Sequence, residues 1–172
     1  CHMQVGETHQ FHALIGFDPT AQTPATDCVQ CHGSHVITAI KAPESIYTVP
    51  RQAESCGQCH STQSEEYSRS AHARALAQFG PSIAPTCLSC HNTAAMGAIT
   101  DPLERKSAVV NMCNECHRDN PEVAGKTLFG TPFITAFENS VHGRALVAGN
   151  PDAPSCTDCH GSHSMDRAIA TD

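Results

Sequence analysis

The chain has 172 residues and a formal charge of −7 at pH 7, so one domain spanning residues 1–172 is expected. It has no basic patch of the kind that binds nucleic acid and no run of 18 apolar residues, which excludes a nucleic-acid partner and a membrane span. Its 11 Cys and 12 His contrast with no Trp, 6 Phe and 2 Tyr, which leaves little aromatic material for a core.

The first third of the chain is predicted to be mainly irregular. Residues 1–27 read as loop with an apolar patch between Phe11 and Phe17. Residues 33–55 contain a short extended segment, Ile46 to Val49, between two prolines.

Three helices are predicted beyond it. The first runs from about Ser64 to Phe79, with a capping box of Thr62 and Glu65 and a stop at Gly80.

The second helix begins at Asp101-Pro102, with Asp101 as N-cap and Glu104 in support, and runs towards Cys113. The third begins at Thr131-Pro132 by the same reasoning and ends at Gly149. Within it, Phe133, Phe137 and Val141 are spaced as one apolar stripe.

A pattern of two cysteines separated by two residues and followed directly by a histidine occurs five times. The copies begin at Cys28, Cys56, Cys87, Cys113 and Cys156. Random order of the same residues gives about 0.05 matches. This C-x-x-C-H pattern is the attachment site of a c-type haem, in which two thiols bond the porphyrin vinyl groups and the histidine binds the iron.

Two other interpretations account for part of the pattern. Paired C-x-x-C knuckles bind zinc through four thiolates, and many cysteines in a small chain can form a disulfide framework. Neither explains a histidine after every pair.

Two further repeats concern histidines outside the motif. Ser70-Ala71-His72-Ala73-Arg74 and Ser140-Val141-His142-Gly143-Arg144 each precede a motif by a similar distance, with a looser copy around His12. Arg74 and Arg144 are candidates to pair with haem propionates, the alternative being solvated helix-surface side chains.

Cys-His-Gly-Ser-His occurs at residues 31–35 and again at 159–163. Histidines three apart cannot lie on opposite sides of one iron, so His35 and His163 are expected to bind a different haem from His32 and His160.

The opening Cys1-His2 is interpreted as the end of a sixth, truncated motif, which would give six haems and twelve histidine ligands. An incidental or lipidated cysteine is the alternative, and His2 or His9 serving a haem of an adjacent subunit is another. The predicted thioether residues are Cys1, Cys28, Cys31, Cys56, Cys59, Cys87, Cys90, Cys113, Cys116, Cys156 and Cys159. The predicted proximal ligands are His2, His32, His60, His91, His117 and His160. The predicted distal ligands are His9, His12, His35, His72, His142 and His163.

From Cys28 to His163 the chain resembles the multihaem c-type cytochromes. The resemblance implies bis-His, low-spin, low-potential haem c, six copies or at least five, in a closely spaced row. The expected fold is mostly irregular, with a few short α-helices wrapped around the haems and little or no β-sheet.

Electron transfer is the function that these features predict, because an iron with two histidines has no open position for a substrate. The alternative is a multihaem reductase acting on a small oxyanion. Export to the periplasm or the exterior is expected, with redox proteins or extracellular acceptors as partners. The number of haems expected for this chain length also resembles that of extracellular cytochromes that polymerise into filaments. The chain is therefore expected to be either a soluble shuttle or a homopolymer joined through terminal haems.

Overall fold

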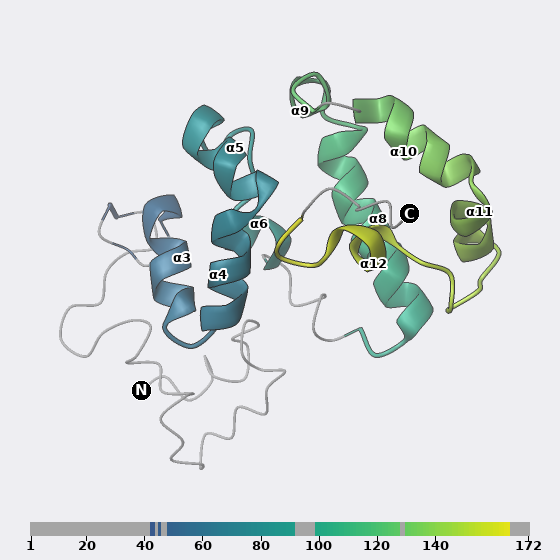
Figure 1. The fold of residues 1–172 in the computed structure, drawn as a ribbon, viewed down its shortest axis with the longest axis horizontal. Helices are drawn as coiled ribbons and strands as arrows, with labels where there is room; N and C mark the ends of the chain where they lie inside the picture. The colour runs from purple at the N-terminus through teal and green to yellow at the C-terminus, as the bar shows by residue number, and fades with distance from the viewer. Residues whose placement is uncertain (1–41, 44, 46–47, 92–98, 128–129, 166–172) are drawn as a thin grey trace, which may run out of the picture. The chain divides into compact units, whose positions relative to one another are not determined.

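In the computed structural model of the chain, the described residues are 42–43, 45, 48–91, 99–127 and 130–165 (Figure 1). They form short helices and contain no β-strand, which confirms the short α-helices and the lack of β-sheet that were expected from the sequence. The helices are α3 (Val49–Gly57), α4 (Ser61–Arg69), α5 (Ala71–Phe79), α6 (Cys87–His91), α8 (Pro102–His117), α9 (Pro121–Ala124), α10 (Gly130–Asn139), α11 (Val141–Val147) and α12 (Cys156–His160). None of the helices in these ranges combines the length and hydrophobicity needed to cross a lipid bilayer.

The chain divides into two compact units. The first comprises Cys1–Glu65 and Thr86–Ala98, and the second comprises Glu66–Pro85 and Ile99–Asp172. In the first unit α3 packs against α6. In the second unit α8 is the central helix, and α9, α10, α11 and α12 all pack against it or against each other.

Helix α8 forms as its sequence predicts, and it extends further. The carboxylate of Asp101 accepts a 2.8 Å hydrogen bond from the backbone N–H of Glu104, and Pro102 occupies the first turn. The helix continues past Cys113 to His117, so it contains the whole fourth motif. Val109 is buried on its core face.

The two other predicted helices are each broken by a serine. Ser70 separates α4 from α5, and its hydroxyl accepts a 3.0 Å hydrogen bond from Ala73 N. Ser140 separates α10 from α11 in the same way, with Gly143 N as the donor at 3.1 Å. The predictions of continuous helices were wrong because serine satisfies the first backbone N–H groups of a new helix.

Smaller details of the predicted ends also differ. Thr62 lies within α4 rather than capping it, and Thr131 lies one residue inside α10. Val49, expected in an extended segment, begins α3, because Pro50 suits the first turn of a helix. The stop at Gly80 is confirmed, with φ of 79° and its N–H bonded to Leu76 O.

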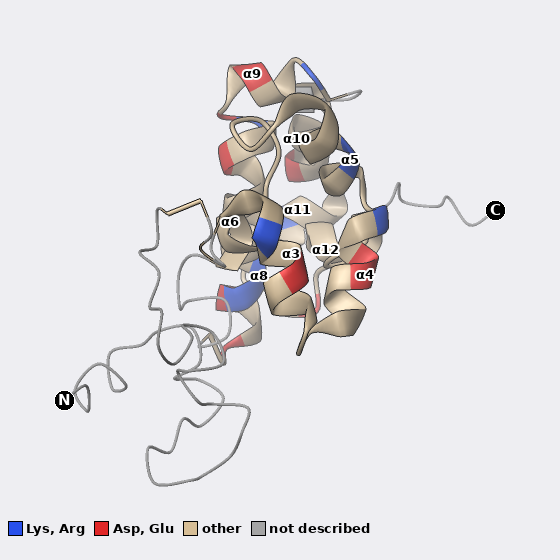
Figure 2. Cartoon of the chain, turned by 90° about the vertical axis from the view of Figure 1, so that its left-hand side faces the viewer, with Lys and Arg blue, Asp and Glu red and all other residues tan. Residues whose placement is uncertain are grey.

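The described apolar core is small. Six hydrophobic side chains are buried within the described ranges, namely Ala84, Val109, Val123, Ile134, Leu146 and Ala153. In the predicted stripe Phe133 is 48% and Val141 68% exposed, and Val141 belongs to the next helix, while the neighbouring Ile134 is buried instead. Acidic and basic side chains are interspersed along the helices, as α8 illustrates with Glu104, Arg105, Lys106 and Glu115 (Figure 2).

Candidate functional site

Each of the four described C-x-x-C-H motifs is built on one helical turn. Helices α6 and α12 consist of nothing but their motif, and in α8 the motif is the last turn. In the remaining copy Cys56 lies near the end of α3, and His60 N donates a 2.8 Å hydrogen bond to Cys56 O, which continues the turn. The motif is therefore a local structure that recurs in both units.

The helical turn explains the spacing of the motif. Residues three and four apart lie on one face of a helix, so the first cysteine is next to both the second cysteine and the histidine. None of the eight described cysteines forms a disulfide, and each is half-buried or exposed. Thioether formation with a haem needs reduced, accessible thiols beside a histidine, and these four turns meet that requirement.

The motif helices are capped by residues that the sequence analysis did not single out. The Asp158 carboxylate accepts hydrogen bonds from Ser155 N and Ser155 Oγ, each at 2.7 Å. Ser89 Oγ accepts a 2.9 Å bond from Thr86 N in the equivalent place. The sequence does contain a signal for these caps, which is a serine or threonine directly before the first cysteine and a polar residue three positions after that serine or threonine. These caps fix the start of the turn that carries the first cysteine.

The first unit brings the motifs of α3 and α6 together. Gln52 on α3 is buried, and its Oε1 accepts a 3.1 Å hydrogen bond from Leu88 N, inside the α6 motif. The thiol of Cys56 hydrogen-bonds that of Cys87 and lowers the pKa of Cys87 to about 7. The first cysteines of the two motifs are thus in contact.

The second unit pairs the motifs of α8 and α12 in the same manner. Lys106 Nζ donates a 2.8 Å hydrogen bond to Ala153 O and so ties α8 to the loop before α12. A hydrogen bond from Cys113 lowers the pKa of the Cys156 thiol. In the same unit burial raises the pKa of Cys116, and the charge of Glu115 adds to that effect.

His72, a predicted distal ligand, lies beside His117, a predicted proximal ligand. Its ring centroid is 6.0 Å from that of His117, and the two ring planes are inclined by 34°. Burial, and then the charge of His117, lowers the pKa of His72 to about 4, while burial and His160 lower that of His117. Both imidazoles are therefore neutral at pH 7, the form that binds a metal.

The surroundings of the other described histidines differ. His163 is half-buried, and its Nδ1 lies 3.6 Å from a Glu66 carboxylate oxygen. Phe133 meets the ring of His160 edge-on at 5.9 Å between centroids. Exposed histidines in the described ranges include His142 on α11, His60 and His91.

Gly161 explains how the closely spaced His160 and His163 take different directions. It ends α12 with φ of 76°, a conformation that favours glycine, and its N–H bonds to Thr157 O. His163 therefore lies outside the helix that carries His160, which is compatible with the prediction that the two histidines bind different haems.

The repeated arginines hydrogen-bond the backbone, and their pairing with haem propionates stays a prediction. Arg74 Nη1 donates to the backbone oxygen of Arg69 at 2.5 Å, and Arg144 Nη1 donates to that of Asn139. Each oxygen belongs to the last residue of the preceding helix, whose terminal carbonyls lack helical partners. These arginines therefore stabilise the corner at which one helix ends and the next begins at a serine. The repeated sequences at Ser70–Arg74 and Ser140–Arg144 both form this corner.

Several predicted site residues lie outside the described part of the chain. They are Cys1, His2, His9, His12, Cys28, Cys31, His32 and His35. Within the described residues, no three or more Cys, His, Asp or Glu side chains gather in an arrangement that could hold a metal ion.

Comparison of the chain with family models, with curated proteins and with solved structures gave no match.

Proposed function

We propose that the chain is a multihaem c-type cytochrome that transfers electrons and is exported from the cytoplasm. The observation that carries this proposal is that each of the four described C-x-x-C-H motifs forms one accessible helical turn with two reduced thiols and a histidine. Zinc and disulfides, the alternatives from sequence, would use the cysteines but give no role to the histidine that ends every motif.

The cysteines and histidines of the motifs would attach and orient each haem. In the described part the thioether positions are Cys56, Cys59, Cys87, Cys90, Cys113, Cys116, Cys156 and Cys159, and the proximal histidines are His60, His91, His117 and His160. A bound haem supplies one-electron chemistry, with a potential set by its ligands, burial and hydrogen bonds. The two covalent bonds and the helical turn fix where the adjacent imidazole sits.

The pairing of motifs within each unit supports electron transfer. Contact between Cys56 and Cys87, and between Cys113 and Cys156, places two attachment points side by side in each unit. Groups attached there would be near neighbours, and closely spaced groups can exchange electrons without a bound substrate.

The distribution of apolar surface supports large bound groups. The described ranges have six buried hydrophobic side chains, but they expose Phe79, Phe133, Val141 and Val147. A buried apolar core this small is expected of a chain that packs around bound groups, since small domains with thin cores need such staples.

Intact mass and optical spectra of protein purified from its native source test the proposal. The expected result is five or six covalently bound haems per chain, with six supporting a haem at Cys1-His2. Colourless protein, or protein carrying zinc, would refute the proposal. Ferric EPR separates the carrier from the reductase, since low-spin iron throughout is expected of a carrier and a high-spin centre of a reductase.

The assembly state separates the two forms of carrier. An acidic soluble shuttle would bind partners through charge, and that binding would weaken as salt increases. A filament subunit would elute as large assemblies in size-exclusion chromatography. Discrete monomers at all salt concentrations would exclude the filament.

A further inference from the structure

His72 and His117 come from different helices and meet in the second unit. His72 is the second residue of α5, and His117 is the last residue of α8. Their ring centroids lie 6.0 Å apart. His117 ends a C-x-x-C-H motif, whereas His72 lies outside any motif.

The separation matches that of two imidazoles on opposite sides of one metal ion. A metal–imidazole nitrogen bond is about 2 Å long, and a ring centroid lies about 1 Å beyond its nitrogen, so trans rings have centroids about 6 Å apart. Any angle between the two ring planes is compatible with such binding, because each ring can turn about its own metal–nitrogen bond. The observed inclination of 34° is therefore allowed.

Contacts at both ends of α5 hold His72 in this position. At the start, Ser70 is fully buried and caps the helix through Ala73 N. At the other end, the ammonium of Lys126 lies 5.7 Å from the centroid of the Phe79 ring. Lys126 follows α9, which packs against α8, so α5 is tied to the helix that carries His117.

We infer that His72 is the second axial ligand of the iron bound by His117, in the haem attached at Cys113 and Cys116. This inference rests on the proposed function. It adds that His72 does not serve the haem attached at Cys87, although the motif beginning at Cys87 is the next one in sequence. The ligand pairing then follows from the tertiary contact between His72 and His117 in the second unit.

Substitution of His72 by glycine in the haem-loaded protein is the first test. The expected result is one ferric iron per chain converted from low spin to high spin in EPR and optical spectra, with low spin restored by added imidazole. Ala73→Gly, on the same helix, is the matched control and should leave every iron low spin. If His72→Gly also leaves every iron low spin, the inference is wrong.

Removal of one attachment site identifies the haem concerned. Cys113→Ser with Cys116→Ser should lower the intact mass by one haem, and His72→Gly in that background should create no new high-spin iron. A new high-spin iron there would show that His72 serves another haem and would overturn the inference.

A second comparison does not depend on that background. His72→Gly and His117→Gly should each affect one iron, and the double variant should affect the same single iron. Two affected irons would overturn the pairing. Wild-type protein without covalent haem would instead refute the proposed function, so the two failures are distinguishable.

Discussion

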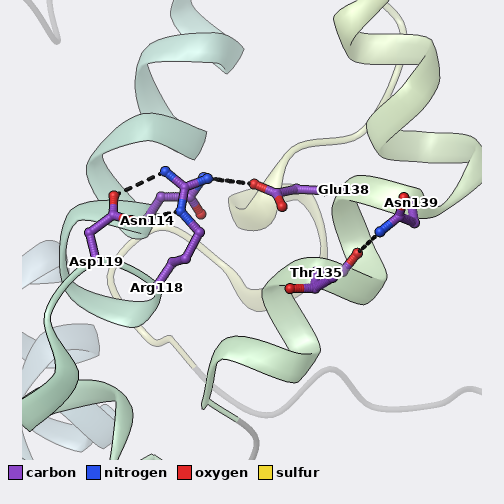
Figure 3. Close-up of polar contacts among 6 residues, drawn as sticks. All are labelled: Asn114, Arg118, Asp119, Thr135, Glu138 and Asn139. Carbon is purple, nitrogen blue, oxygen red and sulfur yellow. Dashed lines mark hydrogen bonds and ion pairs between the residues drawn. The ribbon is translucent and has the colours of Figure 1, made fainter.

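The guanidinium of Arg118 donates a 2.7 Å hydrogen bond to Oε1 of Glu138, which ties the residue directly after His117 to helix α10 (Figure 3). The same Glu138 oxygen accepts from Asn114 Nδ2 at 3.4 Å, within the fourth motif. Arg118 also pairs with its neighbour Asp119, and that hydrogen bond lowers the pKa of Asp119. One carboxylate on α10 thus fixes the end of α8 that presents Cys113, Cys116 and His117.

Arg118→Ala is expected to destabilise the protein slightly. The side chains of Arg118 and Glu138 are 39% and 38% exposed, and solvent screens ion pairs of this kind, so each contributes little to stability. The free energy of unfolding, measured by denaturant titration, should fall slightly, and the fall should be smaller at high salt. Asp119→Asn is the control, because it keeps the bond to α10, and a loss equal to that of Arg118→Ala would contradict the assignment.

Gly143→Ala is expected to destabilise the corner between α10 and α11. A Cβ at this position would lie 2.3 Å from Phe137 O and 2.9 Å from Glu138 Cα, both backbone atoms. Overpacking of this kind costs about 1–3 kcal/mol, whereas helix propensity alone would make alanine more stable than glycine by about 1 kcal/mol. A fall in the free energy of unfolding is therefore the diagnostic sign.

The other corner offers a matched comparison for Gly143→Ala. Ala73 occupies the same place after Ser70 and already carries a Cβ. Ala73→Gly should cost only the propensity difference of about 1 kcal/mol. Equal stability of Gly143→Ala and wild type would show that the backbone of the second corner moves to accept a side chain.

Asp158→Asn is expected to weaken the cap of α12 in a pH-dependent way. Hydrogen bonds from the backbone and then the side chain of Ser155, with a contribution from Lys106, lower the pKa of Asp158 from its ordinary 3.8. A lowered carboxylate pKa stabilises the fold above the unfolded-state pKa, and this stabilisation is lost as pH falls through the folded-state pKa. At neutral pH the loss of a cap costs about 1 kcal/mol.

The measurement is the free energy of unfolding of wild type and Asp158→Asn at pH values from neutral to below 3.8. The difference between the two proteins should be largest near neutral pH and shrink in acid. Glu115→Gln is the control, since Glu115 is exposed and holds the same position in the α8 motif. A difference that stays constant with pH would contradict the role of the carboxylate.

Mild oxidation of the chain purified without haem is expected to join cysteines from different motifs. Cys56 hydrogen-bonds Cys87, and Cys113 hydrogen-bonds Cys156, so each pair of sulfur atoms is in contact. The lowered pKa of Cys87, about 7, also gives it more of the reactive thiolate at neutral pH. Peptide mapping should identify these two disulfides, whereas disulfides confined within each C-x-x-C pair would argue against the pairing of motifs.

Local features of the fold were predicted well from sequence. The cap at Asp101, the stop at Gly80 and the absence of strands in the described ranges all follow from residues close to one another in the chain. The breaks at Ser70 and Ser140 were missed because the apolar spacing continues across both serines. Serine has a weak preference within a helix and a strong one at its start, and an arginine four residues later stabilises the corner.

The sequence by itself determined the repeated motif from which the candidate site is built. Two cysteines and a histidine at spacings of three and four match the period of a helix, so one turn places all three side chains on one face. Only the tertiary structure decided which motifs lie together and which histidine approaches His117. Those relationships depend on how α3 packs with α6 and α12 with α8, and on the contact between His72 and His117. No spacing along the chain encodes the distance between rings on separate helices.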